Sequence, residues 1–199
     1  MNIIIQTSEH PHVPNSVPSR KKRFPRRLAG GDIELVKLSL RGDPARLEEF
    51  FALYRKNLRH LLPWHNEREA LLFKNIAAMK AHIRKQQLSW YAVYYAGTMV
   101  GLIELCEREE YIGLSYWVDE DHLRKGIAHA AIVMMEQALS AVQCACLQAV
   151  ILLDNTPSIN LMQKLHYEKY AVSVYIPDSG HGDGDWMVEF RKTLTEQTP

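Results

Sequence analysis

Near the middle of the chain, residues 116–130 read Tyr116-Trp117-Val118-Asp119-Glu120-Asp121-His122-Leu123-Arg124-Lys125-Gly126-Ile127-Ala128-His129-Ala130. The aromatic and branched segment 111–118 predicts a strand, and apolar residues at helical spacing predict a helix within 124–141. Because the first backbone amides of a helix lack partners and its dipole favours anions, the turn between them is typical of a phosphate-binding site. A glycine at a helix start is also ordinary turn chemistry, so this turn alone identifies no function.

A strand and two helices are predicted upstream of this segment. Alternation around Ile33 and Leu35 predicts the strand. Asp43 and the proline that follows it predict a capped helix. Asn66 is the expected cap of a second helix, which runs to about His82.

The remaining elements alternate between strands and one short helix. Two strands form an expected hairpin around Gly97-Thr98, and a continuous apolar run predicts a strand buried on both faces. The expected strands are 90–95, 99–106, 147–153, 168–176 and 186–192, and the helix is 156–165. This order predicts one α/β (α+β) domain, with a mixed, mostly antiparallel central sheet flanked by helices.

The composition is that of one soluble globular domain. The chain has 199 residues, of which 47% are hydrophobic and 24% charged, so a disordered chain or a disulfide scaffold is excluded. No apolar run approaches the roughly 18–20 residues that a membrane span needs, and no secretory signal is recognised. The three cysteines lie in apolar segments, which favours reduced thiols and a cytoplasmic location.

The N-terminal segment differs in charge from the rest of the chain. Residues 1–30 carry a net charge of +5, and the remainder carries −4. We expect residues 1–31 to be a basic, flexible arm, 32–193 the folded domain and 194–199 a tail. The basic run within 20–27 offers a weak contact for nucleic acid or an acidic partner, and a solvated tail is the alternative interpretation.

The turn at the start of the central helix resembles a motif of the GNAT acyltransferases. The family pattern is [Gln/Arg]-x-x-Gly-x-[Gly/Ala], and this chain reads Leu123-Arg124-Lys125-Gly126-Ile127-Ala128. Gly126 and Ala128 match, whereas Leu123 stands where the family has glutamine or arginine. In the family the backbone amides of this turn hold the pyrophosphate of acetyl-CoA. The resemblance therefore implies a main-chain cradle that lacks one anchoring side chain.

A second motif, 155–167, stands at the family's distance downstream and resembles Asn-x-x-[Ala/Ser]-Ile-x-Leu-[Tyr]-x-Lys-x-Gly-Phe. Many members have a general-acid tyrosine where this chain has Met162. The branch that acetylates the N-termini of ribosomal proteins instead uses a serine, which matches Ser158. His166 and Tyr167 replace the glycine and the phenylalanine, and histidine tolerates a positive φ better than most residues.

Two shorter segments are similar to the same branch. Leu61-Leu62-Pro63-Trp64 resembles its Leu-x-Pro-Trp segment, and Tyr116-Trp117-Val118 resembles its Gly-Tyr-Trp-Leu strand. Gly113 stands where the branch has a glutamate. The resemblance covers about residues 32–193 and implies an N-acetyltransferase that uses acetyl-CoA and an amine acceptor.

The resemblance also implies roles for individual residues. Ser158 is expected to stabilise the leaving thiolate, and Asn155 to bind the pantetheine arm or simply to cap its helix. The strand end, through the amide of Val118, is expected to donate to the thioester oxygen. The residues expected to bind the cofactor are Trp117, Val118, Arg124, Lys125, Gly126, Ile127, Ala128, His129 and Asn155.

The candidate general base is Glu104, which lies in the apolar segment Gly101–Leu105, where an acid is unexpected. An outward-facing charge on an alternating strand is the other interpretation. No metal site is expected, because the histidines show no ligand spacing. The favoured acceptor is a protein N-terminus, followed by a small amine, and the chain is expected to be a monomer or a homodimer. The alternative function is a non-catalytic acyl-CoA-binding regulatory module, because Leu123, Met162, Gly113 and His166 depart from the family pattern.

Overall fold

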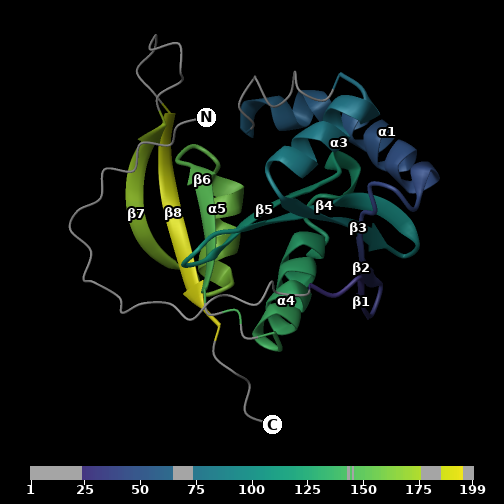
Figure 1. Ribbon diagram of the computed structural model, residues 1–199. Coiled ribbons are helices and arrows are strands. Elements are labelled where there is room, and N and C mark those ends of the chain that lie inside the picture. Colours follow the sequence, from purple (N-terminus) through teal and green to yellow (C-terminus); the bar gives the residue numbers. More distant parts are fainter. Residues whose placement is uncertain (1–23, 65–73, 143, 145, 176–184, 195–199) are drawn as a thin grey trace.

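The computed structural model describes residues 24–64, 74–142, 144, 146–175 and 185–194 (Figure 1). Its sheet has the strand order β1-β2-β3-β4-β5-β6-β8-β7. The strands are β1 (Arg27–Gly30), β2 (Ile33–Lys37), β3 (Leu88–Tyr95), β4 (Thr98–Glu107), β5 (Ile112–Val118), β6 (Cys146–Leu152), β7 (Glu168–Tyr175) and β8 (Asp185–Thr193). The helices are α1 (Pro44–Leu61), α3 (Ile76–Lys85), α4 (Ile127–Ser140) and α5 (Thr156–Lys164), with short 3-10 turns η1 (Leu62–Trp64) and η2 (Glu120–His122).

Every strand pairing is antiparallel except that of β5 with β6. That parallel pair is connected by α4, as a parallel crossover requires. The prediction of a mixed, mostly antiparallel sheet flanked by helices is therefore confirmed.

The first face of the sheet is covered by α1 and α3 (Figure 1). Asp43 caps α1 by accepting a hydrogen bond from the amide of Arg46 at 3.0 Å, as its position before a proline predicts. The apolar stripe of α1 then packs Phe50 against the indole rings of Trp90 and Trp117, with ring centroids 5.3 and 5.9 Å apart. These contacts seat α1 directly over β3 and β5.

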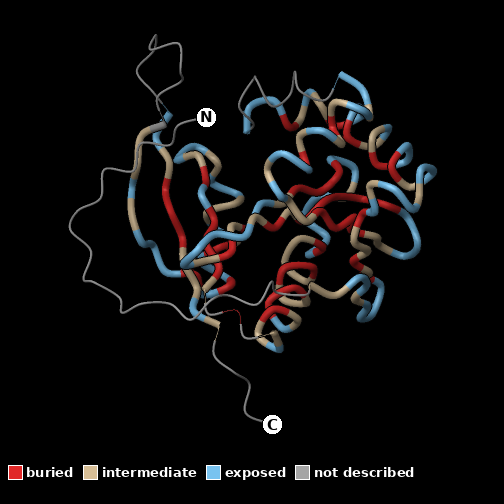
Figure 2. The backbone as a smooth tube through the Cα atoms, viewed as in Figure 1, coloured by how far each residue is buried: buried red, intermediate tan, exposed pale blue. Residues whose placement is uncertain are grey.

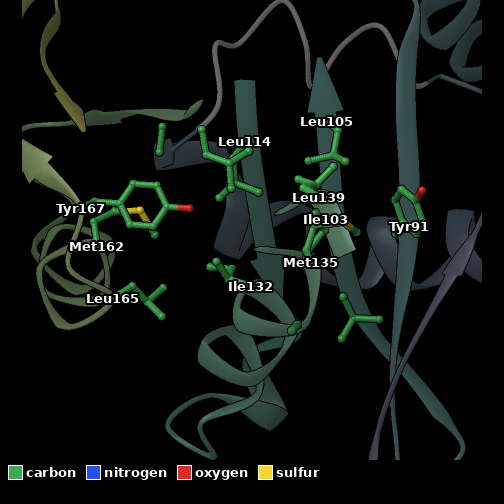
Figure 3. Close-up of a cluster of buried hydrophobic side chains, with 14 of the residues drawn as sticks. Tyr91, Ile103, Leu105, Leu114, Ile132, Met135, Leu139, Met162, Leu165 and Tyr167 are labelled. Carbon is green, nitrogen blue, oxygen red and sulfur yellow. The ribbon is translucent and has the colours of Figure 1, made fainter. Parts of the chain in front are cut away.

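The opposite face packs against α4 and α5 in the larger hydrophobic cluster (Figures 2 and 3). Side chains alternate between faces along a strand, so Ile103 and Leu105 face this cluster whereas Leu102 faces α1. Helix α4 contributes Ile132 and Met135, both fully buried. This helix is therefore fixed beneath the centre of the sheet.

Two elements differ from the sequence predictions. Residues 27–30 were expected to belong to a flexible arm, but they form β1 and pair antiparallel with β2. One helix was expected from Asn66 to about His82, but Asn75 has an extended backbone and caps α3 through the amide of Ala78 at 2.9 Å. Asn66 itself, most of the arm (1–23), residues 195–199 and the glycine-rich segment 179–184 lie outside the described residues.

An irregularity between β3 and β4 shapes the centre of the sheet. The register shifts between Val93, which pairs with Gly101, and Tyr94, which pairs with Met99, so that Val100 is an extra residue. A Cβ atom at Gly101 would lie 2.3 Å from the carbonyl oxygen of Trp117. Only glycine lets β4 approach the end of β5 this closely.

Candidate active site

The two central parallel strands separate soon after they meet. β5 pairs with β6 only through Ile112↔Leu147 and Gly113↔Gln148. From Leu114 to Val118, the ladder partner of β5 is β4 alone. Strands that diverge at their carboxyl ends leave a row of backbone groups open to an extended ligand.

The amide of Val118 is directed into this opening. The next amide, that of Asp119, donates to the carbonyl of Val100 on β4 at 2.7 Å. Because successive amides of a strand point to opposite sides, the N–H of Val118 points away from β4, toward the side from which β6 has diverged. The side chain of Trp117, by contrast, is buried against α1, so only the backbone of Trp117 is available at the site.

Helix α4 begins at this same end of β5. Its N-cap, Gly126, has φ 75° and makes no side-chain capping bond, and Arg124 has φ 61°. A Cβ atom at Gly126 would meet nothing within 4 Å. The first amides of α4 therefore have no side-chain cap, and the exposed cations Arg124 and Lys125 lie just before them, which suits an anion such as a diphosphate.

The predicted residues of this turn do not all reach solvent. Ile127 is buried in the core, whereas Ala128 and His129 are partly buried. Leu123, which replaces the anchoring side chain of the family motif, is 44% exposed. The accessible surface of the turn is therefore formed by residues 123–126, which are exposed, and not by Ile127.

A polar tether, which the sequence analysis did not predict, joins the turn to α1. Lys56 Nζ lies 2.9 Å from both carboxylate oxygens of Asp119 and 2.5 Å from Asp121 Oδ2. The fully buried Asn57 accepts a hydrogen bond from the amide of Glu120 at 2.9 Å. These contacts hold η2, the segment that leads from β5 to the start of α4.

The Asp119 carboxylate is the centre of the tether. Burial acts to raise its pKa, but hydrogen bonds from Lys56, Asn57 and His122 outweigh burial and hold the pKa below its usual value. His122 Nδ1 lies 3.0 Å from Asp119 Oδ2. Asp119 therefore remains ionised and keeps the turn in place.

The second predicted motif lies at the start of α5, which follows β6. Asn155 caps this helix, since its Oδ1 accepts a hydrogen bond from the amide of Ser158 at 3.2 Å. Ser158 is partly buried in the first turn. His166 ends the motif at φ 61°, the left-handed conformation that its replacement of a glycine predicts.

Glu104 lies on the other face of the sheet. It pairs with Ser115 of β5 and Trp90 of β3, and its carboxylate accepts a hydrogen bond from the indole Nε1 of Trp90 at 2.6 Å. Tyr116, one residue beyond Ser115, faces the cluster around α4 and α5. The structure therefore gathers the predicted cofactor residues around the divergent strands and places the candidate base on the opposite face from Ser158.

These features fit a long, extended molecule that carries a diphosphate. The open strand edge would accept amide groups, and the start of α4 would accept the phosphates. Among the described residues, no group of three or more His, Cys, Asp and Glu side chains is arranged to hold a metal ion. None of the helices within the described ranges is long and apolar enough to cross a membrane.

A model of the acetyltransferase (GNAT) family matches residues 47–167, which is more than half of the chain. The chain belongs to this family. The match includes α4 and α5 together with the divergent strands, so the family predicted from the two motifs is confirmed. GNAT enzymes use acetyl-CoA as their acyl donor.

Solved structures of GNAT fold resemble this chain at low sequence identity. The acetyltransferase from Salmonella typhimurium that modifies the N-terminal serine of ribosomal protein L7/L12 has a TM-score of 0.68 and 12% identity, over 83% of this chain and 96% of that one. RimJ from Mycobacterium smegmatis, with a CoA disulfide, has a TM-score of 0.67 and 17% identity, over 84% of both chains. The microcin C7 self-immunity acetyltransferase MccE, with acetyl-CoA and AMP, has a TM-score of 0.69 and 15% identity, over 83% and 94%. No curated protein sequence matches this chain.

Proposed function

We propose that this GNAT protein transfers the acetyl group of acetyl-CoA to a primary amine, with a protein N-terminus as the favoured acceptor and a small amine as the second. The observation that carries the proposal is the divergence of β5 and β6 beside the uncapped start of α4. One arm of a cofactor can extend along the strand edge while its diphosphate meets the helix amides. Neither the open strand edge nor the start of α4 would by itself indicate a site for acetyl-CoA.

The chain's own residues provide the binding contacts. The amides at 126–129 and the cations of Arg124 and Lys125 bind the phosphates, and the backbone at Trp117 and Val118 together with Asn155 orients the arm. Acetyl-CoA supplies an activated thioester carbonyl. The N–H of Val118, which points away from β4, donates to that carbonyl oxygen and stabilises the charge that develops on it.

Two residues on opposite faces of the sheet are proposed to assist the leaving sulfur and the incoming amine. Ser158 donates a hydrogen bond to the sulfur that leaves, and a serine hydroxyl suits stabilisation better than full proton transfer. Glu104, held by the indole of Trp90, accepts the proton of the incoming amine from the opposite face. An α-amine has a pKa of about 7.7–8.0, so a protein N-terminus needs less help from a base than a lysine does.

The acceptor follows from the branch resemblance. The Salmonella enzyme is described as modifying an N-terminal serine, whereas the structure of MccE contains AMP. Both a peptide and a small amine therefore belong in the first panel of acceptors. We place the reaction in the cytoplasm because the three cysteines lie in apolar segments, which favours reduced thiols.

The first experiment is a calorimetric titration with acetyl-CoA, with free adenosine as a control that lacks the diphosphate. Two results together would support the proposal. The protein binds acetyl-CoA but not adenosine, and it releases free CoA thiol when one of the acceptor amines is added. Ser158→Ala is expected to lower turnover and retain binding. Binding without turnover on any peptide or amine would instead favour the non-catalytic acyl-CoA-binding module.

The basic segment 20–27 is proposed as a weak contact for an acidic partner or nucleic acid. Because β1 begins at Arg27 and Phe24 packs against the core, a truncation that tests the segment must end at residue 23. Removal of residues 1–23 is expected to abolish binding to a short RNA at low salt and to leave acetyl-CoA binding unchanged. Unchanged RNA binding would refute the contact.

A further inference from the structure

Three polar side chains on β6 and β8 form a chain of hydrogen bonds beside the opening between β5 and β6. Arg191 Nε on β8 donates to Gln148 Oε1 on β6 at 2.6 Å. Gln148 Nε2 in turn donates to Glu189 Oε2, also on β8, at 3.2 Å. Gln148 is 4% exposed and Glu189 is 8% exposed, so both are buried although they are polar. The acetyl transfer proposed above uses none of these three side chains.

The orientation of the Glu189 carboxylate is set from the far end of this chain. The guanidinium of Arg191 lies 3.6 Å from the centroid of the Tyr170 ring and 5.3 Å from that of the Tyr111 ring. Because an arginine can only donate hydrogen bonds, the amide oxygen of Gln148 faces Arg191 and the amide nitrogen faces Glu189. The carboxylate is therefore held by a donor that is itself fixed in place.

One oxygen of the Glu189 carboxylate is left for a ligand. Among the described residues, Oε1 accepts no hydrogen bond and Glu189 forms no ion pair. Oε1 is also not one of the described side-chain atoms that are both unpartnered and closed off from solvent, so it reaches the molecular surface. Hydrogen bonds between a carboxylate and an ammonium group are about twice as strong as those between neutral groups, so this oxygen favours a cation.

The sheet register places Glu189 on the face opposite α5. Glu189 pairs with Val150 of β6, whose neighbours Ala149 and Ile151 face the cluster around α4 and α5. Because side chains alternate along a strand, Val150 and Glu189 point to the other face, on which Glu104 also lies. Val150 is 48% exposed, so an apolar surface lies open beside the carboxylate.

Glu189 lies deeper in the opening than the amide of Val118. The last pair of β5 with β6 is Gly113↔Gln148, and Val150, the partner of Glu189, comes two residues after Gln148. Val118 comes five residues after Gly113, so it lies three residues, or about 10 Å, further along the opening than Glu189. The hydrogen bond to Gln148 also directs the carboxylate away from Val118. A nitrogen that attacks a thioester held at Val118 therefore cannot also contact Glu189, since a hydrogen bond spans only about 3 Å.

We propose that Glu189 binds a second cationic group of the acceptor, several bonds away from the amine that is acetylated. This inference rests on the proposed function and narrows its acceptor to amines that carry another positive charge, such as a diamine or a peptide with a lysine next to its N-terminal residue. The methylene groups between the two nitrogens lie over Val150. Glu189 takes part in no covalent step; it determines which amines are held in place to react.

The test compares acceptors that differ in this one charge. Pentylamine is compared with 1,5-diaminopentane, and the peptide Ser-norleucine-Ala-Ala is compared with Ser-Lys-Ala-Ala. With the wild-type protein, kcat/KM is expected to be about tenfold higher for the doubly charged member of one pair, through a lower KM rather than a higher kcat. The pair that shows this preference identifies the source of the second cation.

Two variants separate contact with Glu189 from a general effect of charge. Glu189→Gln removes the charge and retains an oxygen that can accept from Gln148, so it should fold with the same melting temperature and bind acetyl-CoA equally well. Its KM for the doubly charged acceptor should rise about tenfold, which abolishes the preference. Glu168→Gln is the matched control, because Glu168 is exposed on β7 and pairs with Arg191 on the same face. This control should keep the preference.

The outcomes distinguish this inference from the proposed function. Equal kcat/KM values within both pairs of acceptors would overturn the second-cation site and leave the acetyltransferase proposal intact. So would a Glu189→Gln variant that loses activity equally on singly and doubly charged acceptors, or a preference that disappears equally in Glu168→Gln. A wild-type protein that acetylates none of the four acceptors and no other amine would overturn both proposals.

Discussion

Gly101→Ala, a substitution on β4, should displace the end of β5 and so disturb the proposed acetyl-CoA site. The added Cβ would lie 2.3 Å from the carbonyl oxygen of Trp117 and 3.1 Å from Val118 Cα, and both are backbone atoms that cannot rotate away. The end of β5 must therefore shift. Forced overpacking costs about 1–3 kcal/mol, which corresponds to roughly 3–9 °C in the melting temperature of a chain this long.

A shift of β5 should also lower the rate of acetyl transfer, because the N–H of Val118 is proposed to hold the thioester oxygen. A misplacement of about 1 Å can cost about a hundredfold, and a shift of several tenths of an ångström should lower kcat/KM about tenfold. Thermal melting and steady-state assays with acetyl-CoA measure the two effects.

A matched control is available on the neighbouring strand. Gly113→Ala makes the same substitution in β5, where the new Cβ would meet its nearest atoms at 3.5 Å, an ordinary contact. This variant should keep its activity and its melting temperature. Equal losses in the two variants, or an unchanged kcat/KM in Gly101→Ala, would refute the argument from close approach.

Three other substitutions test the turn, the tether and the helix cap. Gly126→Ala and Gly97→Ala each place a side chain at positive φ and should each cost about 1 kcal/mol of stability, but only Gly126→Ala should weaken acetyl-CoA binding in calorimetry. The pKa of Asp119 is held below its usual value, so its contribution to stability is complete above about pH 4 and is lost as the pH falls through the folded-state pKa. Asp119→Asn should therefore melt at a lower temperature than wild type at pH 7, with a difference that narrows in acid; a constant difference would contradict this assignment. Asn155→Ala should lower the melting temperature by about 2–4 °C through loss of the α5 cap, whereas Asn160→Ala, at an exposed position of the same helix, should not.

Local patterns predicted most of the elements because they depend on neighbours in the chain. Asp43 and its proline mark the start of α1, and Ala96-Gly97, both at positive φ, form the turn of the predicted β3–β4 hairpin. β1 was missed because Arg27–Gly30 is short and follows a basic run, so only its pairing with β2 defines it. The start of α3 was misplaced because an earlier asparagine offered an equally good cap.

The parts of the site that the sequence did not predict depend on contacts between residues far apart in the chain. The motifs located Gly126, Asn155 and Ser158, since each acts through its own helix start. The tether between Lys56 and Asp119 joins residues 63 positions apart, and no local pattern encodes that separation. An asparagine at 57, in register with the apolar stripe of α1, was the one available signal of a buried polar contact.

The seam between β5 and β6, with its two residue pairs, divides the sheet into a part β1–β5 and a part β6–β8–β7. The hydrophobic cluster into which α4 and α5 pack also connects the two parts, as does the contact of Arg191 on β8 with the ring of Tyr111. A ligand that extends along the seam would act as a missing strand and bond the two parts into one mechanical unit. Its binding should therefore raise the cooperativity of unfolding and slow amide exchange along β6 as well as β5, far beyond the atoms that it touches.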